Sequence, residues 1–432
     1  MANARVLGLL RRPGVGKVLT LLARTPMPVI APDELAGRRP SGTFEVTSAI
    51  VDVIDPPPPA VAPGALDGDV VVKDQIDVAG LRTGIGMASG GEVAERDATI
   101  VARIRAAGGR IVGKAKMTEL GIDGIGSVMH YPMPVNPRAP GYSPGGSSTG
   151  TAVAVASGFA RYGLGGDGLG SIRIPAAFCG LVGLKPGRER IPRDGIRSPV
   201  RTLDAVGPIA RTVDDCARLW QVIAGEPIED VHAWVPERVG IVHRPWMRAA
   251  RSIEQAFDRV LRALGVQCDR VVLPRLDRAT FLGGLIGAHE LATGPYATEV
   301  RSGAGHTSRT LGEAISAADA ALLYQIRDRL RESTAQVLAH TPILALPTTA
   351  IPPPALTESL LSGAAEVRLL RALGAFTPLA NLCDLPAIAV PCGVDDRGRP
   401  LSVMFVGRAG QEAALLGLAK AVEATGLALT PV

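Results

Sequence analysis

The sequence predicts an α/β protein built on a largely parallel or mixed β-sheet. Short β-branched runs alternate along the chain with segments of helical spacing, which is typical of this class. Apolar residues make up 47% of the 432 residues and charged residues 20%, so a large core can be buried. Aromatic residues are only 3%, whereas 51 Gly and 35 Pro mark many short loops between elements. The core is therefore expected to consist mainly of Ala, Val, Leu and Ile.

The first elements follow a Pro-rich run at residues 56–59, which separates an N-terminal helical arm and linker, residues 1–60, from the main body, residues 61–432. We expect a buried strand at 69–74, a helix at 94–107 that stops at two glycines, and a second strand at 110–112. A helix of small residues is expected at 151–160. A further helix should begin after the capping residue Thr212 and place four apolar residues on one face: Cys216, Leu219, Trp220 and Ile223.

The second half of the body has weaker patterns. Residues 225–345 contain a predicted strand at 239–242 and predicted helices near 251–264 and 313–339. After a Pro-rich loop at 347–354, strands are expected at 387–391 and 401–406. A last helix at 411–425 should end at Gly426.

Composition excludes several functions. The net charge is only +5 and aromatic residues are scarce, so we expect no nucleic-acid partner. No apolar run reaches the roughly 18–20 residues of a transmembrane helix. The five cysteines are odd in number and form no Cys-x-x-Cys pair, which disfavours a disulfide framework or a zinc site and favours the cytoplasm.

Two motifs look chemical but fail on inspection. Residues 108–114 have the spacing of a phosphate-binding loop, yet Ala115 stands where a hydroxyl must hold Mg²⁺. Residues 141–145 match the Gly-x-Ser-x-Gly elbow of α/β-hydrolases around Ser143. The prolines before that motif cannot form a strand interior, and Pro144 has no N–H for an oxyanion hole. We predict that neither motif is a functional site.

A third pattern is longer. It joins Ser-Pro-Gly-Gly-Ser-Ser-Thr-Gly at 143–150 to a Gly-rich run at 165–180 and to Gly-Leu-Lys-Pro at 183–186. Further motifs keep a fixed order, at 72–74, 76–80, 113–119, 376–378, 381–382, 385–387 and 390–393. In these motifs the sequence resembles the amidase signature family of serine hydrolases, from about residue 45 onward. The resemblance implies a single large domain with a central mixed sheet covered by helices on both faces. Its core would be residues 61–215 and 375–432, and its variable substrate-facing region about 225–345.

The resemblance also implies a Ser–cis-Ser–Lys site. By motif position, Ser171 would be the nucleophile, Ser147 the bridging serine after a cis peptide with Gly146, and Lys73 the base. Backbone N–H groups of the turn would form the oxyanion hole, from Gly168, Leu169, Gly170 and Ser171. Asp167 and Arg173 of the same motif would support this turn.

Chemistry makes these roles reasonable. A serine hydroxyl is a weak nucleophile until a base takes its proton. The six histidines lie in dissimilar contexts without an evident Asp partner, whereas Lys73 ends an apolar strand, where burial would favour the neutral amine. Leu169 departs from the family, in which Gly is commoner at this position. A leucine still supplies an N–H unless the position needs positive φ, and its side chain would shape the acyl pocket.

We therefore expect an amidase that acts on a small-molecule amide, without metal or organic cofactor. Two alternatives remain. The same site could serve an amidotransferase or an amide-forming acyltransferase, although Ile174 stands where tRNA-linked subunits usually carry Gln. The chain could also be a catalytically silent binding or partner subunit. No strong charge cluster marks the variable segments, which favours a neutral amide of moderate size. A homodimer is common in the family, so the resemblance allows one here.

Overall fold

The structure is a computed structural model that describes residues 46–54, 65–244, 248–273, 276–361 and 367–428. The predicted N-terminal helical arm falls mainly on residues 1–45 and 55–60, outside the described residues. The segment between them forms a short 3-10 helix, η2 (Val46–Ala49), and the edge strand β1 (Ile50–Val53).

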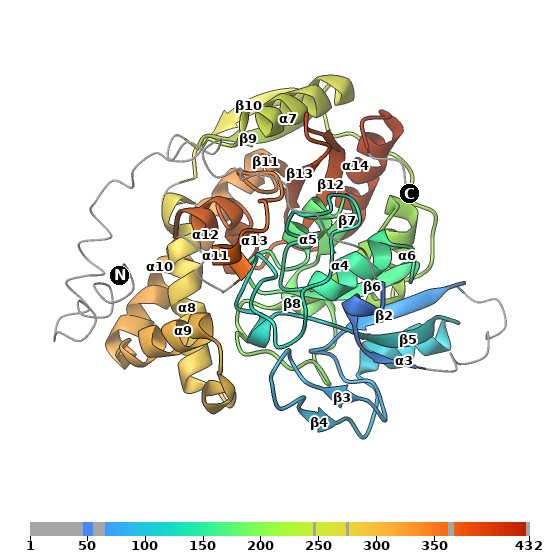
Figure 1. Ribbon diagram of the computed structural model, residues 1–432. Helices are drawn as coiled ribbons and strands as arrows, with labels where there is room; N and C mark the ends of the chain where they lie inside the picture. Colours follow the sequence, from blue (N-terminus) through green and yellow to red (C-terminus); the bar gives the residue numbers. More distant parts are fainter. Residues whose placement is uncertain (1–45, 55–64, 245–247, 274–275, 362–366, 429–432) are drawn as a thin grey trace.

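A mixed sheet of 11 strands forms the centre of the described chain, in the order β1-β5-β2-β6-β8-β7-β12-β13-β11-β9-β10 (Figure 1). β2 pairs in parallel with β5 and β6, and β9 pairs in parallel with β10 and β11, whereas the strands between these two groups pair antiparallel. β3 and β4 form a separate small sheet. The strands after β1 are β2 (Asp69–Lys73), β3 (Arg82–Thr83), β4 (Glu92–Val93), β5 (Arg110–Ala115), β6 (Tyr162–Asp167), β7 (Val182–Lys185), β8 (Ala205–Ala210), β9 (Arg238–Val242), β10 (Gln267–Val271), β11 (Ile343–Pro347), β12 (Ala387–Val394) and β13 (Pro400–Gly407).

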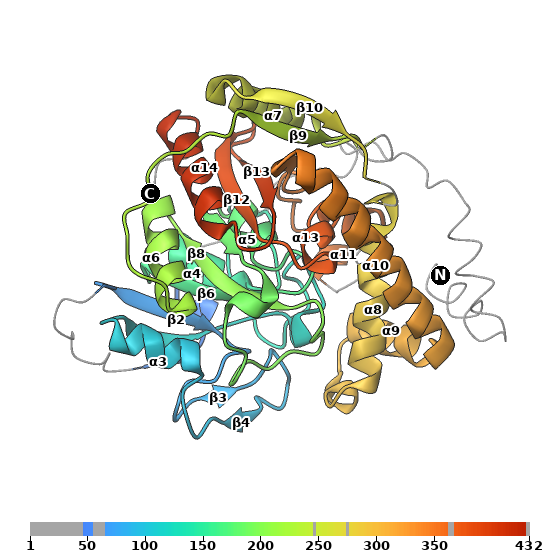
Figure 2. The ribbon, with the colours of Figure 1, turned by 180° about the vertical axis from the view of Figure 1, so that it is seen from behind.

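Helices cover both faces of this sheet, so the predicted α/β class with a mixed sheet is confirmed (Figures 1 and 2). The α-helices are α3 (Thr99–Ala106), α4 (Thr149–Ala156), α5 (Arg173–Phe178), α6 (Val213–Ala224), α7 (Arg251–Leu264), α8 (Ala279–Thr293), α9 (Gly303–Glu313), α10 (Ala317–His340), α11 (Glu358–Leu361), α12 (Val367–Leu373), α13 (Pro378–Leu382) and α14 (Glu412–Ala424). The remaining 3-10 helices are η3 (Glu119–Gly121), η4 (Arg188–Arg190), η5 (Leu276–Arg278) and η6 (Ala297–Glu299).

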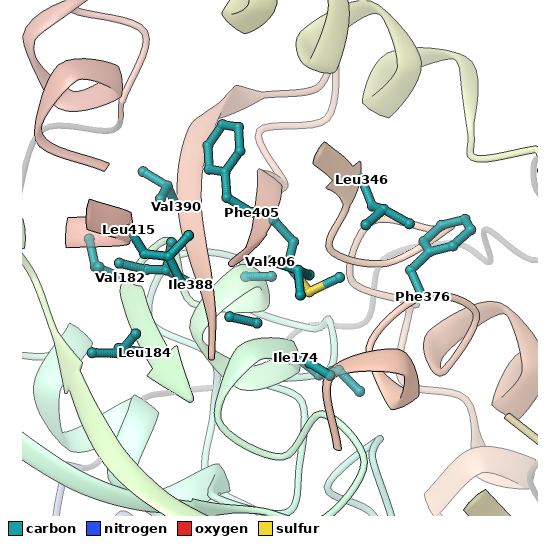
Figure 3. Packing of buried hydrophobic residues seen from close by; sticks show 14 of the residues in the cluster. Ile174, Val182, Leu184, Leu346, Phe376, Ile388, Val390, Phe405, Val406 and Leu415 are labelled. Carbon is teal, nitrogen blue, oxygen red and sulfur yellow. The ribbon is translucent and has the colours of Figure 1, made fainter. Parts of the chain in front are cut away.

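The two faces carry separate cores. Successive side chains of a strand point to opposite faces, and β2 shows this directly. Val70 and Val72 join the larger core with α3, α6 and α14, whereas Val71 joins a smaller core with the residues of α4. Figure 3 shows part of the larger core, where side chains of β7, β12 and β13 lie beside Leu415 of α14. Because α4 consists of small residues, it lies close against its face: a Cβ added at Gly163 of β6 would be 2.7 Å from Thr151 Cγ2.

Several helix ends have visible causes. Thr212 caps α6 as predicted, since its side chain accepts a hydrogen bond from the Asp215 N–H at 3.2 Å. The predicted helix at 313–339 is α10, which begins at Ala317 because Ser316 accepts from the Asp319 N–H at 3.2 Å. The predicted helix at 94–107 begins only at Thr99.

A group of three helices, α8, α9 and α10, lies beside the sheet rather than on it (Figures 1 and 2). Glu119 of η3 joins this group to the sheet. It is fully buried, and it accepts hydrogen bonds from the N–H groups of Arg301 at 2.8 Å and Ser302 at 3.0 Å, at the start of α9. The helical group is thereby held next to the loops that follow β5 and β6.

Candidate active site

Lys73 is the last residue of β2, and its side chain is 1% exposed. The three valines before it are buried in the interior strand β2. The ammonium group of Lys73, at the end of this strand, is therefore buried as well. Nζ donates to Ser147 Oγ at 2.8 Å and to the Gly166 carbonyl at 3.0 Å. Burial lowers the pKa of Lys73 to about 8, against the attraction of the Asp204 and Asp167 carboxylates. A neutral amine is therefore accessible near neutral pH.

Ser147 lies in the loop before α4, and the Gly146–Ser147 peptide is cis. A glycine is required at 146, since an added Cβ would be 2.4 Å from the Asp123 carbonyl oxygen. The Gly146 N–H donates to the Gly124 carbonyl at 2.8 Å. One residue further, the Ser148 N–H donates to the Ser171 carbonyl at 3.2 Å. The structure therefore brings Lys73 and Ser147 into contact and places the Ser171 turn next to the serine loop.

Ser171 lies between β6 and α5, in a tight turn, and its side chain is 9% exposed. Gly170 has φ +132°, and a Cβ there would be 2.5 Å from Thr377 Oγ1, so only glycine fits. The Gly170 N–H donates to Asp167 Oδ1 at 2.6 Å, and the Ile172 N–H donates to Asp167 Oδ2 at 3.1 Å. Asp167 thus holds the turn on both sides of the serine.

Asp167 is held in turn by Arg173, and both side chains are fully buried. The guanidinium donates from Nε to Oδ2 and from Nη2 to Oδ1, each at 3.0 Å. Burial disfavours the charged carboxylate, but Arg173 outweighs burial and holds the pKa of Asp167 well below its usual range. Such a bidentate pair fixes the orientation of the carboxylate and also compensates its charge. The turn is therefore supported by an ion pair that stays charged.

The turn offers fewer free N–H groups than predicted. Of the four expected oxyanion donors, Gly170 already donates to Asp167. In the described part of the chain, the N–H groups of Gly168, Leu169 and Ser171 have no protein acceptor. Leu169 is not among the non-glycine residues with positive φ, so a leucine fits this position without backbone strain.

Ser171 opens into a cavity of about 290 Å³. The described wall carries no ionisable side chain and is mostly apolar. It is formed by Leu120, Gly121, Ile122, Gly124, Gly168, Leu169, Ser171, Ile174, Val200, Thr280, Gly284, Gly287, Ala288, Leu291, Ser308, Leu370, Leu373, Gly374 and Pro378. Five of these residues belong to α8, so the predicted substrate-facing region contributes a large part of the wall.

Both motifs that the sequence led us to dismiss have structural roles. Residues 110–115 form strand β5, and Lys114 Nζ lies 3.5 Å from Asp74 Oδ1 and donates to the Arg82 carbonyl at 3.0 Å. Ser143 is fully buried, and its hydroxyl donates to the Ile125 carbonyl at 2.6 Å. Neither residue opens onto the cavity.

Sequence reasoning assigned no role to Thr377, Asn381 or Gln75. Thr377 donates from Oγ1 to the Leu169 carbonyl at 2.7 Å, and Asn381 donates from Nδ2 to the Asp167 carbonyl at 2.7 Å. Gln75 donates to Asp204 Oδ2 at 2.9 Å, and this carboxylate is one of the two that act on Lys73. For Thr377 and Asn381, the signal available in the sequence was a polar residue within a mostly apolar stretch, whereas Gln75 stands among charged residues and gave no such signal.

The described residues hold no group of three or more His, Cys, Asp or Glu side chains arranged to bind a metal ion. Among the described helices, none has the length and apolarity needed to cross a membrane.

Comparison with known proteins matches the family model described as Amidase to residues 64–280 and 288–416. The chain is 32% identical to a fatty acid amide hydrolase of Medicago truncatula over 363 residues, which are 76% of this chain and 59% of that protein. The chain thus spans about three fifths of the length of this plant relative. It is also 32% identical to a glutamyl-tRNA(Gln) amidotransferase subunit of Natronomonas pharaonis over 404 residues, which are 82% of this chain and 94% of that protein.

Comparison with solved structures gives the same family. A crystal structure of an amidase superposes with a TM-score of 0.77 at 26% identity, over 88% of this chain and 92% of that one. A 6-aminohexanoate cyclic dimer hydrolase has the same fold, with a TM-score of 0.75 at 24% identity, over 84% of this chain and 86% of that one. Since the family model covers most of the chain and the fold agrees over more than four fifths of it, this protein belongs to the amidase signature family.

Proposed function

We propose that this chain is an amidase that hydrolyses a carboxamide C–N bond through an acyl-enzyme on Ser171. One observation carries the proposal: a buried lysine with a pKa of about 8 contacts Ser147 Oγ, in the loop bonded to the Ser171 turn. A lysine is costly to bury, so a buried lysine that contacts a serine hydroxyl beside the turn of the cavity-lining Ser171 indicates a chemical role.

In the first half-reaction, Ser171 Oγ attacks the amide carbonyl carbon, and its proton moves to Ser147 while Ser147 passes its own proton to Lys73. The N–H groups of Gly168, Leu169 and Ser171 stabilise the resulting oxyanion. The loss of one such donor typically costs about 3 kcal/mol in the transition state. The C–N bond then breaks, and the leaving amine takes the proton back through Ser147.

In the second half-reaction, water attacks the Ser171 ester. One water proton passes through Ser147 to Lys73 and then returns to Ser171 Oγ as the ester bond breaks. The products are a carboxylic acid and an amine, and the enzyme is regenerated. No cofactor takes part in these steps.

A second candidate function uses the same acyl-enzyme with an amine or ammonia as acceptor. The likeness to a glutamyl-tRNA(Gln) amidotransferase favours this candidate. The cavity argues against it, because a glutamine donor carries an ammonium and a carboxylate, and the described wall has no charged side chain to pair with either. A silent partner subunit is disfavoured by the intact contact between Lys73 and Ser147.

The test is amide turnover with two acceptors. The enzyme is incubated with butyramide, hexanamide and benzamide, with and without hydroxylamine, and ammonia, acid and hydroxamate are measured. A hydrolase releases acid and ammonia in equal amounts without hydroxylamine, and Ser171→Ala lowers the rate at least about 1,000-fold. Product formed only when hydroxylamine is present would instead favour a transferase. Equal turnover by Ser171→Ala would contradict the proposed nucleophile.

We also propose a reducing compartment, the cytoplasm, as the site of action. The five cysteines are unpaired, and burial raises the pKa of Cys179 and of Cys216, which keeps both thiols protonated and inert.

A further inference from the structure

We propose that Leu169, seated on Gly283 of α8, sets the length of the acyl group that the site accepts, and that this group is neutral, apolar and of moderate size. The inference rests on the proposed function, because it concerns the same Ser171 cavity.

The peptide group that joins Leu169 to Gly170 is fixed through both its N–H and its carbonyl. Gly170 donates its N–H to Asp167, and the Leu169 carbonyl accepts from Thr377 Oγ1 at 2.7 Å. The side chain lines the cavity two residues before Ser171. A side chain so close to the nucleophile and on a fixed backbone limits the space next to the reacting carbonyl.

The Leu169 side chain packs against α8. A Cβ added at Gly283 would be 2.6 Å from Leu169 Cδ2, which is closer than real carbon atoms approach. One helical turn further, a Cβ at Gly287 would be 3.3 Å from Val200 Cγ1. Glycine within a helix is less stable than alanine, so its presence at these positions needs a reason. At Gly283 the reason is that the Leu169 side chain packs against the helix where a Cβ would otherwise lie.

Gly284 offers an internal comparison. Gly284 lines the cavity, as Leu169 does, but a Cβ at position 284 would have no atom within 4 Å. An alanine at 284 therefore narrows the cavity without moving Leu169, whereas an alanine at 283 must displace the Leu169 side chain, which itself lines the cavity.

The wall defines the chemistry of the ligand. Its described side chains include no charge, and three carry hydroxyls. Ser171 is the nucleophile, and the Thr280 hydroxyl already donates to the Gly374 carbonyl at 2.5 Å. A charged acyl group would lose its hydration without a partner. A cavity of about 290 Å³ lies at the small end of ligand pockets, which limits the acyl group to moderate size.

The test uses alkylphosphonofluoridates with alkyl chains of about 2, 4, 6, 8, 10 and 12 carbons. This series runs from chains shorter than a pocket of this size to chains that fill it. Ser171 Oγ forms a bond to phosphorus, fluoride leaves, and the serine proton moves through Ser147 to Lys73. The alkyl group bonded to phosphorus takes the place of the acyl chain. Inactivation rate constants are measured for each chain length, and the labelled residue is mapped by mass spectrometry.

The readout is the ratio of the rate for the 10-carbon probe to the rate for the 4-carbon probe, which cancels effects common to both. We expect Leu169→Ala to raise this ratio about ten-fold or more, since one methylene in an apolar pocket typically changes rates by at least that factor. Leu169→Met should leave the ratio near that of the wild type. Gly283→Ala should lower it.

The double variants give the decisive comparison. Leu169→Ala should restore the long-chain rate in Gly283→Ala by removing the atoms that clash, but should act on Gly284→Ala only additively. Equal behaviour of the two glycine variants, or an unchanged ratio in Leu169→Ala while Ser171 is labelled, overturns the inference and leaves the proposed function intact. Absence of any adduct on Ser171 overturns both. Circular dichroism of each variant shows whether it is folded, and the comparison of Gly283→Ala with Gly284→Ala keeps the test valid if Leu169→Ala is not folded.

Discussion

The pH dependence of turnover follows directly from the burial of Lys73. Its pKa falls from an ordinary 10.5 to about 8, a change that corresponds to about 3 kcal/mol of lost preference for the charged form. At pH 7.5 roughly a quarter of the molecules would then hold a neutral Lys73, against about 0.1% for an ordinary lysine, a gain of roughly 200-fold in competent base. We therefore expect kcat/KM to rise with pH and to level off above about 8.

The perturbation that tests this reasoning is Asp204→Asn. Asp204 is buried, and its carboxylate raises the pKa of Lys73. Its removal should shift the midpoint of the kcat/KM profile to lower pH, measured from about pH 5 to 10 on a neutral amide such as hexanamide. The rate at about pH 6 should rise relative to the plateau.

Lys185 provides the matched control. It is also buried, and burial and the nearby Arg173 lower its pKa to about 8, but its Nζ donates to the Pro186 carbonyl and contacts neither serine. Lys185→Met should leave the midpoint in place. A midpoint that moves in Lys185→Met but not in Asp204→Asn would refute the assignment of Lys73 as the titrating base.

Three further predictions concern stability. Lys73→Met should abolish turnover yet raise the free energy of unfolding at pH 7 by about 1–3 kcal/mol in urea titrations, because a buried amine with a lowered pKa opposes folding. The gain should shrink as pH rises from about 8 toward 10.5, and a variant less stable than the wild type at pH 7 would count against the burial argument. Asp167→Asn leaves Arg173 buried without a counter-charge and should cost about 3–5 kcal/mol in the same assay, whereas a cost below about 1 kcal/mol would show that the pair is dispensable. Glu119→Gln weakens the anchor at the start of α9, so hydrogen exchange of the α8 and α9 amides should accelerate while α14 keeps its protection; equal exchange in both would contradict this role.

Local sequence patterns were sufficient for elements whose ends are chemically marked. α6 begins after its predicted cap and ends at Gly225, and α7 spans residues 251–264 as expected. Residues 69–73 form the predicted buried strand because three successive valines fit a strand covered on both faces. In such cases the local signal and the tertiary environment favour the same conformation.

Other elements could not be predicted because their residues are chosen for close packing. β6 contains three glycines and β8 contains Pro208, yet both lie in the centre of the sheet. The glycines of α8 resemble a loop in the sequence, and their reason becomes visible only when Leu169 lies against Gly283. Such contacts join distant parts of the chain, and no local pattern reports them.

In the candidate site, too, some features could be predicted from the sequence and others depend on the folded structure. Ordered motifs predicted Lys73 and Ser147 as partners across 74 positions, and the structure places them 2.8 Å apart. The motifs did not predict that Asp167 would occupy the Gly170 N–H, or that Thr377 would fix the Leu169 carbonyl. Those contacts depend on backbone geometry within a single turn, which residue types alone do not specify.

The most direct test of the central claim is labelling with a reporter-bearing fluorophosphonate, followed by peptide mapping of the adduct. We expect one adduct, on Ser171, that disappears in Lys73→Met. It should persist in Lys116→Met, since Lys116 is a buried lysine that lies over the Tyr131 ring, 5.3 Å from its centre, rather than beside the serines. An adduct on Ser143, or labelling of Ser171 that is unaffected by Lys73→Met, would contradict the Ser171–Ser147–Lys73 account.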